Sequence, residues 1–307
     1  MFNRGISDEF VRALRHWPHW GRIVEDGQLF IAVRDKSINI YFQGCSLLKV
    51  SYRKEELVLE THYKYLIRPD RKKPYIRWDG DNSLVEGLAD KILMDKFDVE
   101  SLKKSSRWYA APEKAGLHRI LMSNSNIVDV EVALSHESAD EEGGANPLAT
   151  GKRVVDRIDF AAIQKSGDRP CVVFFEAKRF DNSELRSQLH KPPVIEQTER
   201  YKDFIEKHLP DFKKSYGRVC SNLVGLGLNR IDPIVPEVAR KPEQLEIVPD
   251  VRLVVYDFDQ DQNDGKVWKE HKAILQNHFR DRLLLKGSPT EFTTGISEWD
   301  SKVAARA

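Results

Sequence analysis

The sequence predicts an α/β protein of the α+β type, with a mixed β-sheet flanked by helices and a smaller α+β unit in front of it. Two patterns support this fold class. Residues 1–105 hold one opening helical stretch and then short strand-like runs separated by turn residues. After about residue 110, apolar runs of strand length alternate with longer stretches of helical period. We therefore predict an N-terminal domain over 1–105 and a second domain over 106–307.

The N-terminal domain begins with an amphipathic helix over 8–17, predicted from apolar residues at helical spacing. Turn residues then separate four predicted strands, over 28–33, 38–43, 47–52 and 57–65. A second stretch of helical period predicts a helix over 83–97.

The second domain begins with a helix at 112–121, where Pro112 takes the first helical position. Apolar runs then predict strands over 127–134, 157–163 and 172–178, with a polar loop over 138–152 before the second of them. The remaining elements are a helix over 193–208, strands over 219–228 and 251–258, and a helix over 268–284. From residue 112 to residue 228 the predicted order is therefore α-β-β-β-α-β.

Composition excludes several classes of protein. The chain has 307 residues, of which 40% are hydrophobic and 32% are charged, with a formal net charge of +1. No apolar stretch approaches the roughly 18 residues of a membrane span, and residues 1–9 lack the apolar core of a signal peptide. The three cysteines, Cys45, Cys171 and Cys220, form no CxxC motif. We expect a cytoplasmic protein with buried free thiols, no structural zinc and no membrane partner.

A basic segment over 68–78 is a candidate for nucleic-acid contact. Aromatic residues interrupt its positive charges, a composition that suits phosphate contact combined with base stacking. A solvated loop is the alternative interpretation. The candidate phosphate-binding residues are Arg71, Lys72, Lys73 and Arg77.

Charged residues inside two apolar strands give the strongest functional signal. Glu176 and Lys178 are two apart in one strand, so their side chains share a face of the sheet. If residues 165–168 form the turn, Asp159 of the preceding strand lies opposite Phe174 and diagonal to Glu176. Diagonal neighbours are roughly 7–8 Å apart at the backbone, which lets two carboxylates reach one cation. A cross-strand salt bridge at a sheet edge is the alternative interpretation.

These residue types suit hydrolysis of phosphodiesters with a divalent metal. Asp159 and Glu176 would hold Mg²⁺ or Mn²⁺, with the carbonyl oxygen of Ala177 as a further ligand. A bound metal lowers the pKa of a water ligand and neutralises charge on the phosphate. Lys178 would orient that water or stabilise the transition state.

This set of residues resembles the PD-(D/E)xK nuclease superfamily, in which an Asp in the second core strand is followed by (D/E)xK in the third. Here the matching residues are Asp159 and Glu176-Ala177-Lys178, with Ile158 where the motif name has Pro. The next helix carries Gln197 and Tyr201, four residues apart on one face, which resembles the QxxxY signature of the RecB-like branch.

The resemblance covers about residues 110–230 and implies a restriction-endonuclease-like core in the αβββαβ order. It also implies a further acidic residue from the first core helix, for which Glu113 is the positional candidate. Glu131, which interrupts the strand over 127–134, is the alternative.

The prediction is therefore a Mg²⁺- or Mn²⁺-dependent nuclease that cuts DNA by attack of water on phosphorus. The resemblance favours an endonuclease in restriction or anti-phage defence. The N-terminal domain would recognise DNA, sense a trigger, or bind a partner subunit or a second copy. Two alternatives stay open: a catalytically silent nucleic-acid-binding or assembly protein with the same fold, and a nuclease for RNA or branched DNA.

Overall fold

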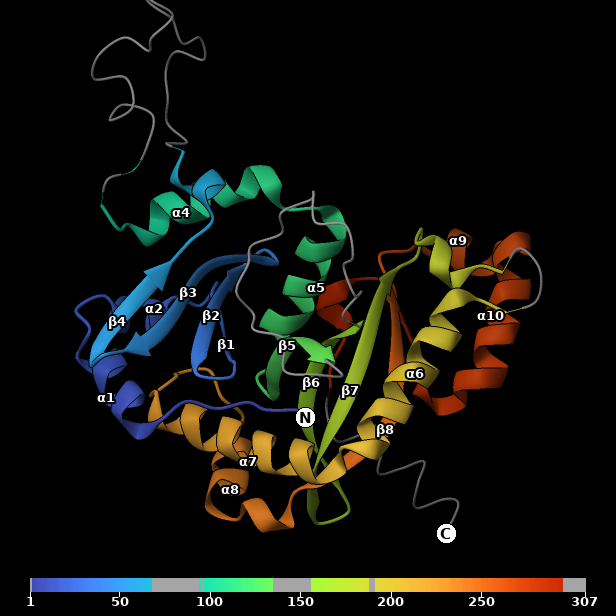
Figure 1. Ribbon diagram of the computed structural model, residues 1–307. Helices are drawn as coiled ribbons and strands as arrows, with labels where there is room; N and C mark the ends of the chain where they lie inside the picture. The colour runs from blue at the N-terminus through green and yellow to red at the C-terminus, as the bar shows by residue number, and fades with distance from the viewer. Residues whose placement is uncertain (1, 68–93, 95, 135–155, 188–190, 295–307) are drawn as a thin grey trace, which may run out of the picture.

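The computed structural model describes residues 2–67, 94, 96–134, 156–187 and 191–294, which form two sheets lying side by side (Figure 1). The N-terminal sheet is an antiparallel meander of β1 (Phe30–Val33), β2 (Ser37–Phe42), β3 (Cys45–Arg53) and β4 (Glu56–Glu60). Helices α1 (Asp8–His16) and α2 (Trp20–Glu25) precede it, and α4 (Val99–Ser106) follows it. The four predicted strands are confirmed, although the last is shorter and gives way to a 3₁₀ turn, η1 (Tyr63–Leu66). The helix predicted over 83–97 falls almost entirely outside the described residues.

The second sheet has the order β5 (Ile127–Leu134), β6 (Asp156–Ser166), β7 (Arg169–Arg179), β8 (Glu246–Tyr256) and β9 (Leu283–Lys286). The first three strands are antiparallel to one another, whereas β8 runs parallel to β7 and β9 parallel to β8. Helix α5 (Pro112–Ser123) leads into β5. Between β7 and β8 the chain forms α6 (Pro193–Lys207), α7 (Leu209–Gly225) and α8 (Ile234–Arg240). The predicted mixed sheet flanked by helices is confirmed.

One predicted element is wrong, and a second ends earlier than predicted. The strand predicted over 219–228 is the second half of α7, whose buried residues Phe212, Tyr216, Val219, Cys220 and Leu223 follow helical spacing. Pro210 ends one helix and also occupies the first turn of the next, where proline is well tolerated. The strand that completes the core is instead β8. Near the C-terminus, α9 (Gln260–Asp264) and α10 (Lys266–Phe279) precede β9, so the helix predicted to continue to residue 284 ends five residues earlier.

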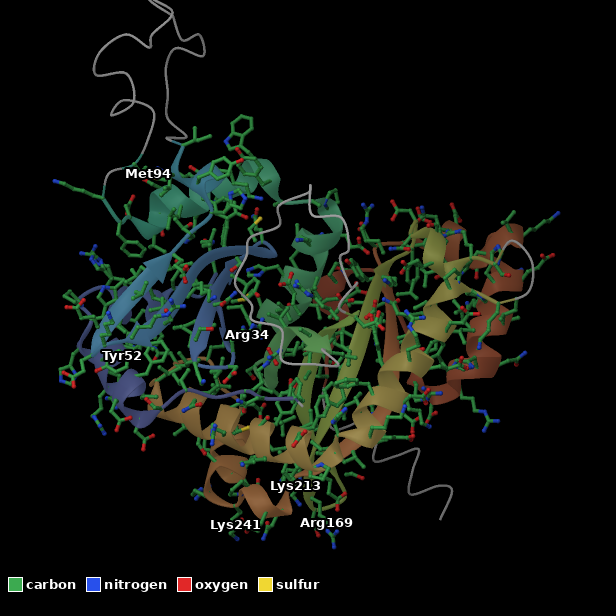
Figure 2. All side chains as sticks on the ribbon, viewed as in Figure 1. Arg34, Tyr52, Met94, Arg169, Lys213 and Lys241 are labelled. Carbon is green, nitrogen blue, oxygen red and sulfur yellow. The ribbon has the colours of Figure 1, made fainter. Side chains whose placement is uncertain are left out.

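The hairpin between β6 and β7 is tighter than predicted. Ser166 pairs with Arg169, which leaves only Gly167 and Asp168 in the turn, and Gly167 has a φ of +57°. A glycine adopts this left-handed conformation without steric penalty. The pairing puts Ala161, rather than Asp159, opposite Phe174. Figure 2 shows Arg169, the first residue of β7, at the lower end of the sheet.

The error in register is two residues, an even number. Because side chains alternate between faces with a period of two, an even shift leaves each residue on the predicted face. Extending the register by one residue from the pair Phe160 and Phe175 places Asp159 next to Glu176 on the neighbouring strand.

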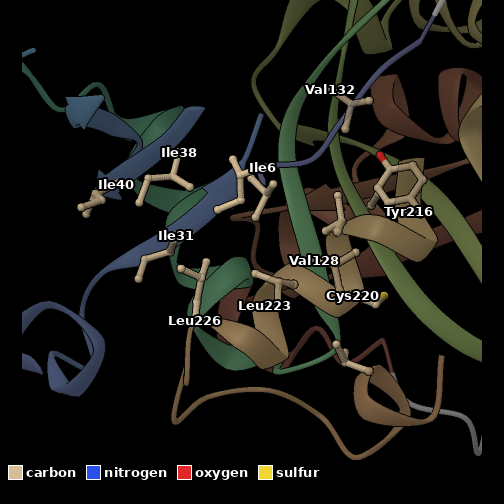
Figure 3. Close-up of a cluster of buried hydrophobic side chains, with 14 of the residues drawn as sticks. Ile6, Ile31, Ile38, Ile40, Val128, Val132, Tyr216, Cys220, Leu223 and Leu226 are labelled. Atoms are coloured by element: carbon tan, nitrogen blue, oxygen red, sulfur yellow. The ribbon is translucent and has the colours of Figure 1, made fainter. Parts of the chain in front are cut away.

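The hydrophobic core is continuous between the two sheets. One cluster of buried side chains includes Ile31 and Ile38 of the N-terminal sheet, Val128 of β5 and Leu223 of α7 (Figure 3). Helix α7 passes along one end of both sheets (Figure 1). The predicted boundary between residues 105 and 106 falls inside the last turn of α4, and the interior packing crosses it.

The expectation that the cysteines are buried is confirmed for Cys45, Cys171 and Cys220. Within the described ranges, none of the helices combines the length and apolar character that crossing a bilayer requires.

Candidate functional site

The three charged residues predicted in β6 and β7 lie together in the structure. The Nζ atom of Lys178 is 2.8 Å from Oε1 of Glu176, and the side chain of Glu176 is only 2% exposed. Asp159 turns its carboxylate towards β7, where Oδ2 accepts a hydrogen bond of 2.7 Å from the backbone N–H of Ala177. The other carboxylate oxygen of Glu176, Oε2, is buried without a hydrogen-bond partner among the described residues. A buried carboxylate oxygen without a partner is unusual, because such groups are normally satisfied.

Burial and neighbouring negative charges raise the pKa values of both carboxyl groups. Burial raises the pKa of Glu176 well above its ordinary value, and the neighbouring charge of Asp159 adds to this effect. Burial also raises the pKa of Asp159, to about 6, against the opposing influence of Lys178 and of the Ala177 N–H. Burial acts to lower the pKa of Lys178, but the charges of Glu176 and Asp159 raise it above its ordinary value. Two adjacent carboxylates with raised pKa values beside a protonated lysine are typical of a functional site.

Helix α6 brings the predicted glutamine and tyrosine to this group. Nε2 of Gln197 donates to the hydroxyl of Tyr201 over 2.7 Å, and that hydroxyl donates to the carbonyl oxygen of Arg157 over 2.8 Å. Burial raises the pKa of Tyr201, and the nearby charges of Glu176 and Asp159 raise it further. The amide oxygen of Gln197 is buried and has no described partner. The pair therefore lies beside the carboxylates, with one acceptor free.

Glu113 and Glu184 both contact the side chain of Asn182. Glu113, in the first turn of α5, accepts a hydrogen bond of 3.0 Å from the side-chain amide of Asn182, and its charge contributes to the raised pKa of Asp159. Glu184 was not predicted, yet its Oε2 lies 2.5 Å from Nζ of Lys178. It is six residues after Lys178 in the chain, within the turn η3 (Ser183–Leu185) that follows β7. An acidic residue soon after the ExK triplet was the available signal.

Glu131 occupies a strained position in β5. Its φ is 50°, between the paired residues Val130 and Val132, and a left-handed backbone costs a residue with a side chain roughly 1–2 kcal/mol. Its Oε2 accepts a hydrogen bond of 3.1 Å from the hydroxyl of Tyr41, on strand β2 of the N-terminal sheet. The charge of Glu131 contributes to the raised pKa of Asp159. Unlike the other non-glycine residues with positive φ among the described residues, Glu131 lies inside a strand, and backbone strain often clusters at functional positions.

A buried ion cluster lies beside the hydrogen bond between Tyr41 and Glu131. The sequence did not predict this cluster. Arg34, which follows β1, forms an ion pair with the fully buried carboxylate of Asp129 in β5 and donates to the hydroxyl of Tyr41 over 3.0 Å. Nε of Arg4 donates to the second oxygen of Asp129 over 3.2 Å. Figure 2 shows Arg34 between the two sheets. The hydrogen bonds therefore run from Asp129 through Arg34 and Tyr41 to Glu131, next to the carboxylates of the site.

The residues fit a magnesium ion. No group of three or more His, Cys, Asp and Glu side chains is arranged for a metal among the residues that the structure describes. Mg²⁺ does not need such a cage, because it is commonly bound by one or two carboxylates and keeps waters or substrate phosphates as its other ligands. The unpartnered oxygen of Glu176 and the adjacent carboxylate of Asp159 would supply that set.

The four basic residues predicted to contact phosphates, Arg71, Lys72, Lys73 and Arg77, lie outside the described residues.

The raised pKa of Asp159 predicts that stability falls as the pH rises when no divalent metal is present. Between its ordinary value of 3.8 and about 6, the folded state binds more protons than the unfolded state. The free energy of unfolding should then fall by up to about 3 kcal/mol across this window, and Glu176 should extend the loss above it. Urea unfolding at several pH values in EDTA measures this effect.

The matched variant for this experiment is Asp159→Asn, which should flatten the pH dependence between pH 4 and 6. Mg²⁺ should also reduce the loss in the wild-type protein, because the metal binds the deprotonated carboxylates. Equal pH profiles for the wild type and Asp159→Asn would show that this carboxyl titrates normally in the folded state.

In comparisons with known proteins, the chain matches no family model, and neither a curated protein nor a solved structure is significantly similar to it.

Proposed function

We propose that this chain is a divalent-metal-dependent nuclease that hydrolyses phosphodiester bonds in DNA. The observation that carries the proposal is the pair of adjacent carboxylates with raised pKa values, one of them with an unpartnered oxygen, beside the ammonium group of Lys178. A structural salt bridge would leave no such oxygen and would not need a second carboxylate. Buried like charges are costly and are kept where a cation or a reaction uses them.

The topology supports the same proposal. The order α5, β5, β6, β7, α6 and β8, with three antiparallel strands and a fourth parallel to the third, agrees with the core implied by the resemblance to the PD-(D/E)xK superfamily. Helices α7 and α8 are additional elements inserted before the last core strand. In such a core, Asp159, Glu176 and Lys178 would share one face with Gln197 and Tyr201.

Each residue then has a defined role. Asp159, Glu176 and the carbonyl oxygen of Ala177 would hold Mg²⁺ or Mn²⁺. When bound, the ion supplies an activated water and neutralises charge that develops on the phosphate. Lys178 remains protonated because its pKa is raised, so it acts as a hydrogen-bond donor and positive charge rather than as a general base. Glu184 and Glu176 fix the position of its ammonium group.

Gln197 and Tyr201 would position the substrate or the Asp159 strand. The hydroxyl of Tyr201 is already bonded to the backbone of β6, which fixes α6 against the strand that carries Asp159. The Gln197 side chain keeps its amide oxygen free to accept a hydrogen bond from a water molecule at the site. An endonuclease in restriction or anti-phage defence, acting as an oligomer or with a partner subunit, is the context that the resemblance favours.

The test is cleavage of supercoiled and linear DNA in the presence of Mg²⁺, Mn²⁺ or EDTA. We expect cutting with either metal and none in EDTA, and nicking of the closed circle would identify endonuclease action. Calorimetric titration with Mn²⁺ provides a readout that does not depend on catalysis. A protein that binds Mn²⁺ but cuts neither DNA nor RNA would favour the catalytically silent alternative. One that does not bind Mn²⁺ would overturn the proposed site.

A further inference from the structure

An exposed aromatic surface lies just before α5, the helix that carries Glu113. It is formed by the turn η1 and by a second turn, η2 (Arg107–Tyr109), which directly follows α4. The side chains of Tyr63, Trp108 and Tyr109 are 75%, 81% and 43% exposed. Together with Ile67 they make up four of the seven exposed large hydrophobic residues in the described part of the chain. Such a concentration of exposed apolar area marks an interaction site more often than a random feature of a surface.

Contacts hold the two turns together. The rings of Tyr65 and Tyr109 have centroids 5.9 Å apart, and Nζ of Lys64 lies 5.0 Å from the centroid of each ring. The hydroxyl of Ser105, at the end of α4, donates a hydrogen bond of 2.6 Å to the carbonyl oxygen of Ile67. Trp108 projects from this supported base into solvent. The surface is therefore a fixed platform that keeps an indole ring exposed.

Positive charges surround the aromatic side chains. Lys64 belongs to η1, Arg107 to η2, and Lys114 to the first turn of α5. None of these three makes an ion pair with a carboxylate among the described residues. Arg107 and Lys114 are exposed. Cations beside exposed rings match the composition of surfaces that bind single-stranded nucleic acid, where phosphates meet cations and bases stack on rings.

A short segment of chain joins the platform to the helix that carries Glu113. Trp108 precedes Glu113 by five residues, a length that spans at most about 18 Å. Glu113 in turn is hydrogen-bonded to Asn182, in the loop after β7. Figure 1 shows α4 and the start of α5 at the same end of the molecule. A nucleic-acid strand a few nucleotides long would reach from the platform to the site.

We propose that Trp108, with Tyr63, Lys64 and Arg107, binds an unpaired segment of the DNA substrate by stacking a base on the indole ring. The identification of the ligand as DNA rests on the proposed function. The unpaired form follows from the geometry, because a base in the interior of a duplex has no free face to offer an exposed ring. The surface would thus favour DNA that has a single-stranded end, gap or bubble near the cleavage point.

Binding is measured by fluorescence anisotropy with a labelled oligothymidine of about 12 nucleotides, in EDTA so that no cleavage occurs. Trp108→Ala should weaken binding about 5- to 10-fold, the lower part of the range for loss of one stacked base, and Trp108→Phe should restore most of it. Arg107→Gln should reduce the slope of log affinity against log salt by about 0.7, whereas Trp108→Ala should leave the slope unchanged.

The matched control is Val267→Ala, a comparably exposed apolar residue on α10. It should leave binding unchanged. Equal affinity of the wild type and Trp108→Ala would overturn the inference, even if the protein cleaves DNA, and tighter binding of oligouridine would overturn the assignment to DNA. The variant Glu176→Gln should bind the oligonucleotide as the wild type does. Binding that depends on Trp108 would therefore support the platform even if cleavage were absent.

Discussion

Replacement of Lys178 by methionine is expected to lower the rate of metal-dependent DNA cleavage by about 100- to 1,000-fold. Methionine keeps a long unbranched side chain but lacks the ammonium that lies between Glu176 and Glu184. The variant should still bind Mn²⁺, because an ammonium group is not a metal ligand. Cleavage under saturating metal, measured beside calorimetric Mn²⁺ binding, separates these two effects.

Glu176→Gln provides the contrasting result. The amide has one oxygen and no charge, so both Mn²⁺ binding and cleavage should be lost. The free energy of unfolding in EDTA at neutral pH should be unchanged or higher, because the substitution removes a buried carboxyl that repels Asp159.

The matched controls are Lys165→Met, an ion-paired lysine on β6, and Glu196→Gln, an exposed glutamate on α6. Both should cleave DNA at the wild-type rate. If Lys178→Met cleaved DNA as fast as Lys165→Met, the ammonium group would have no part in the reaction.

Asp129→Asn is expected to have the largest effect on stability, a loss of about 3–5 kcal/mol in the free energy of unfolding. The carboxylate of Asp129 is fully buried and neutralises two arginines, Arg4 and Arg34, that are also buried. Its replacement by a neutral amide leaves two positive charges in the interior without an anion. Urea unfolding monitored by tryptophan fluorescence measures the change.

The control for this substitution is Asp156→Asn on the neighbouring strand. Asp156 pairs with Arg200, whose side chain is largely exposed, so its loss should change stability by less than about 1 kcal/mol. A change of similar size in both variants would mean that the arginines of the Asp129 cluster reach water or find other partners.

The strands of the site could be predicted because their residues carry a local signal. Apolar runs bounded by turn residues located β5, β6 and β7, and the two-residue spacing of Glu176 and Lys178 fixed their common face. The turn could also have been placed correctly, since Gly167-Asp168 is a two-residue hairpin sequence. The second half of α7 was predicted as a strand because its apolar residues were read over a short stretch. Val219 and Leu223 are four residues apart and both buried, which is the spacing of a helix.

The connection between the sheets could not be predicted in the same way. Arg4, Arg34 and Asp129 are separated by 30 and 95 residues, and nothing local distinguishes these arginines from surface ones. Only the fold brings them together, where one carboxylate serves both cations. The same holds for Trp108, whose exposure depends on how η1 and η2 pack.

The interior shared by the two sheets bears on how the chain responds to a cut in its backbone. Ile6 of the N-terminal segment bonds through its N–H to the side chain of Asn222 over 3.0 Å, and Phe2 stacks on Phe212 with centroids 3.9 Å apart. Together with the buried charges at Asp129, these contacts tie the first 35 residues to β5 and α7. A protease that nicks the chain between residues 106 and 111 would therefore release no free fragment, and the two pieces would migrate together until denatured.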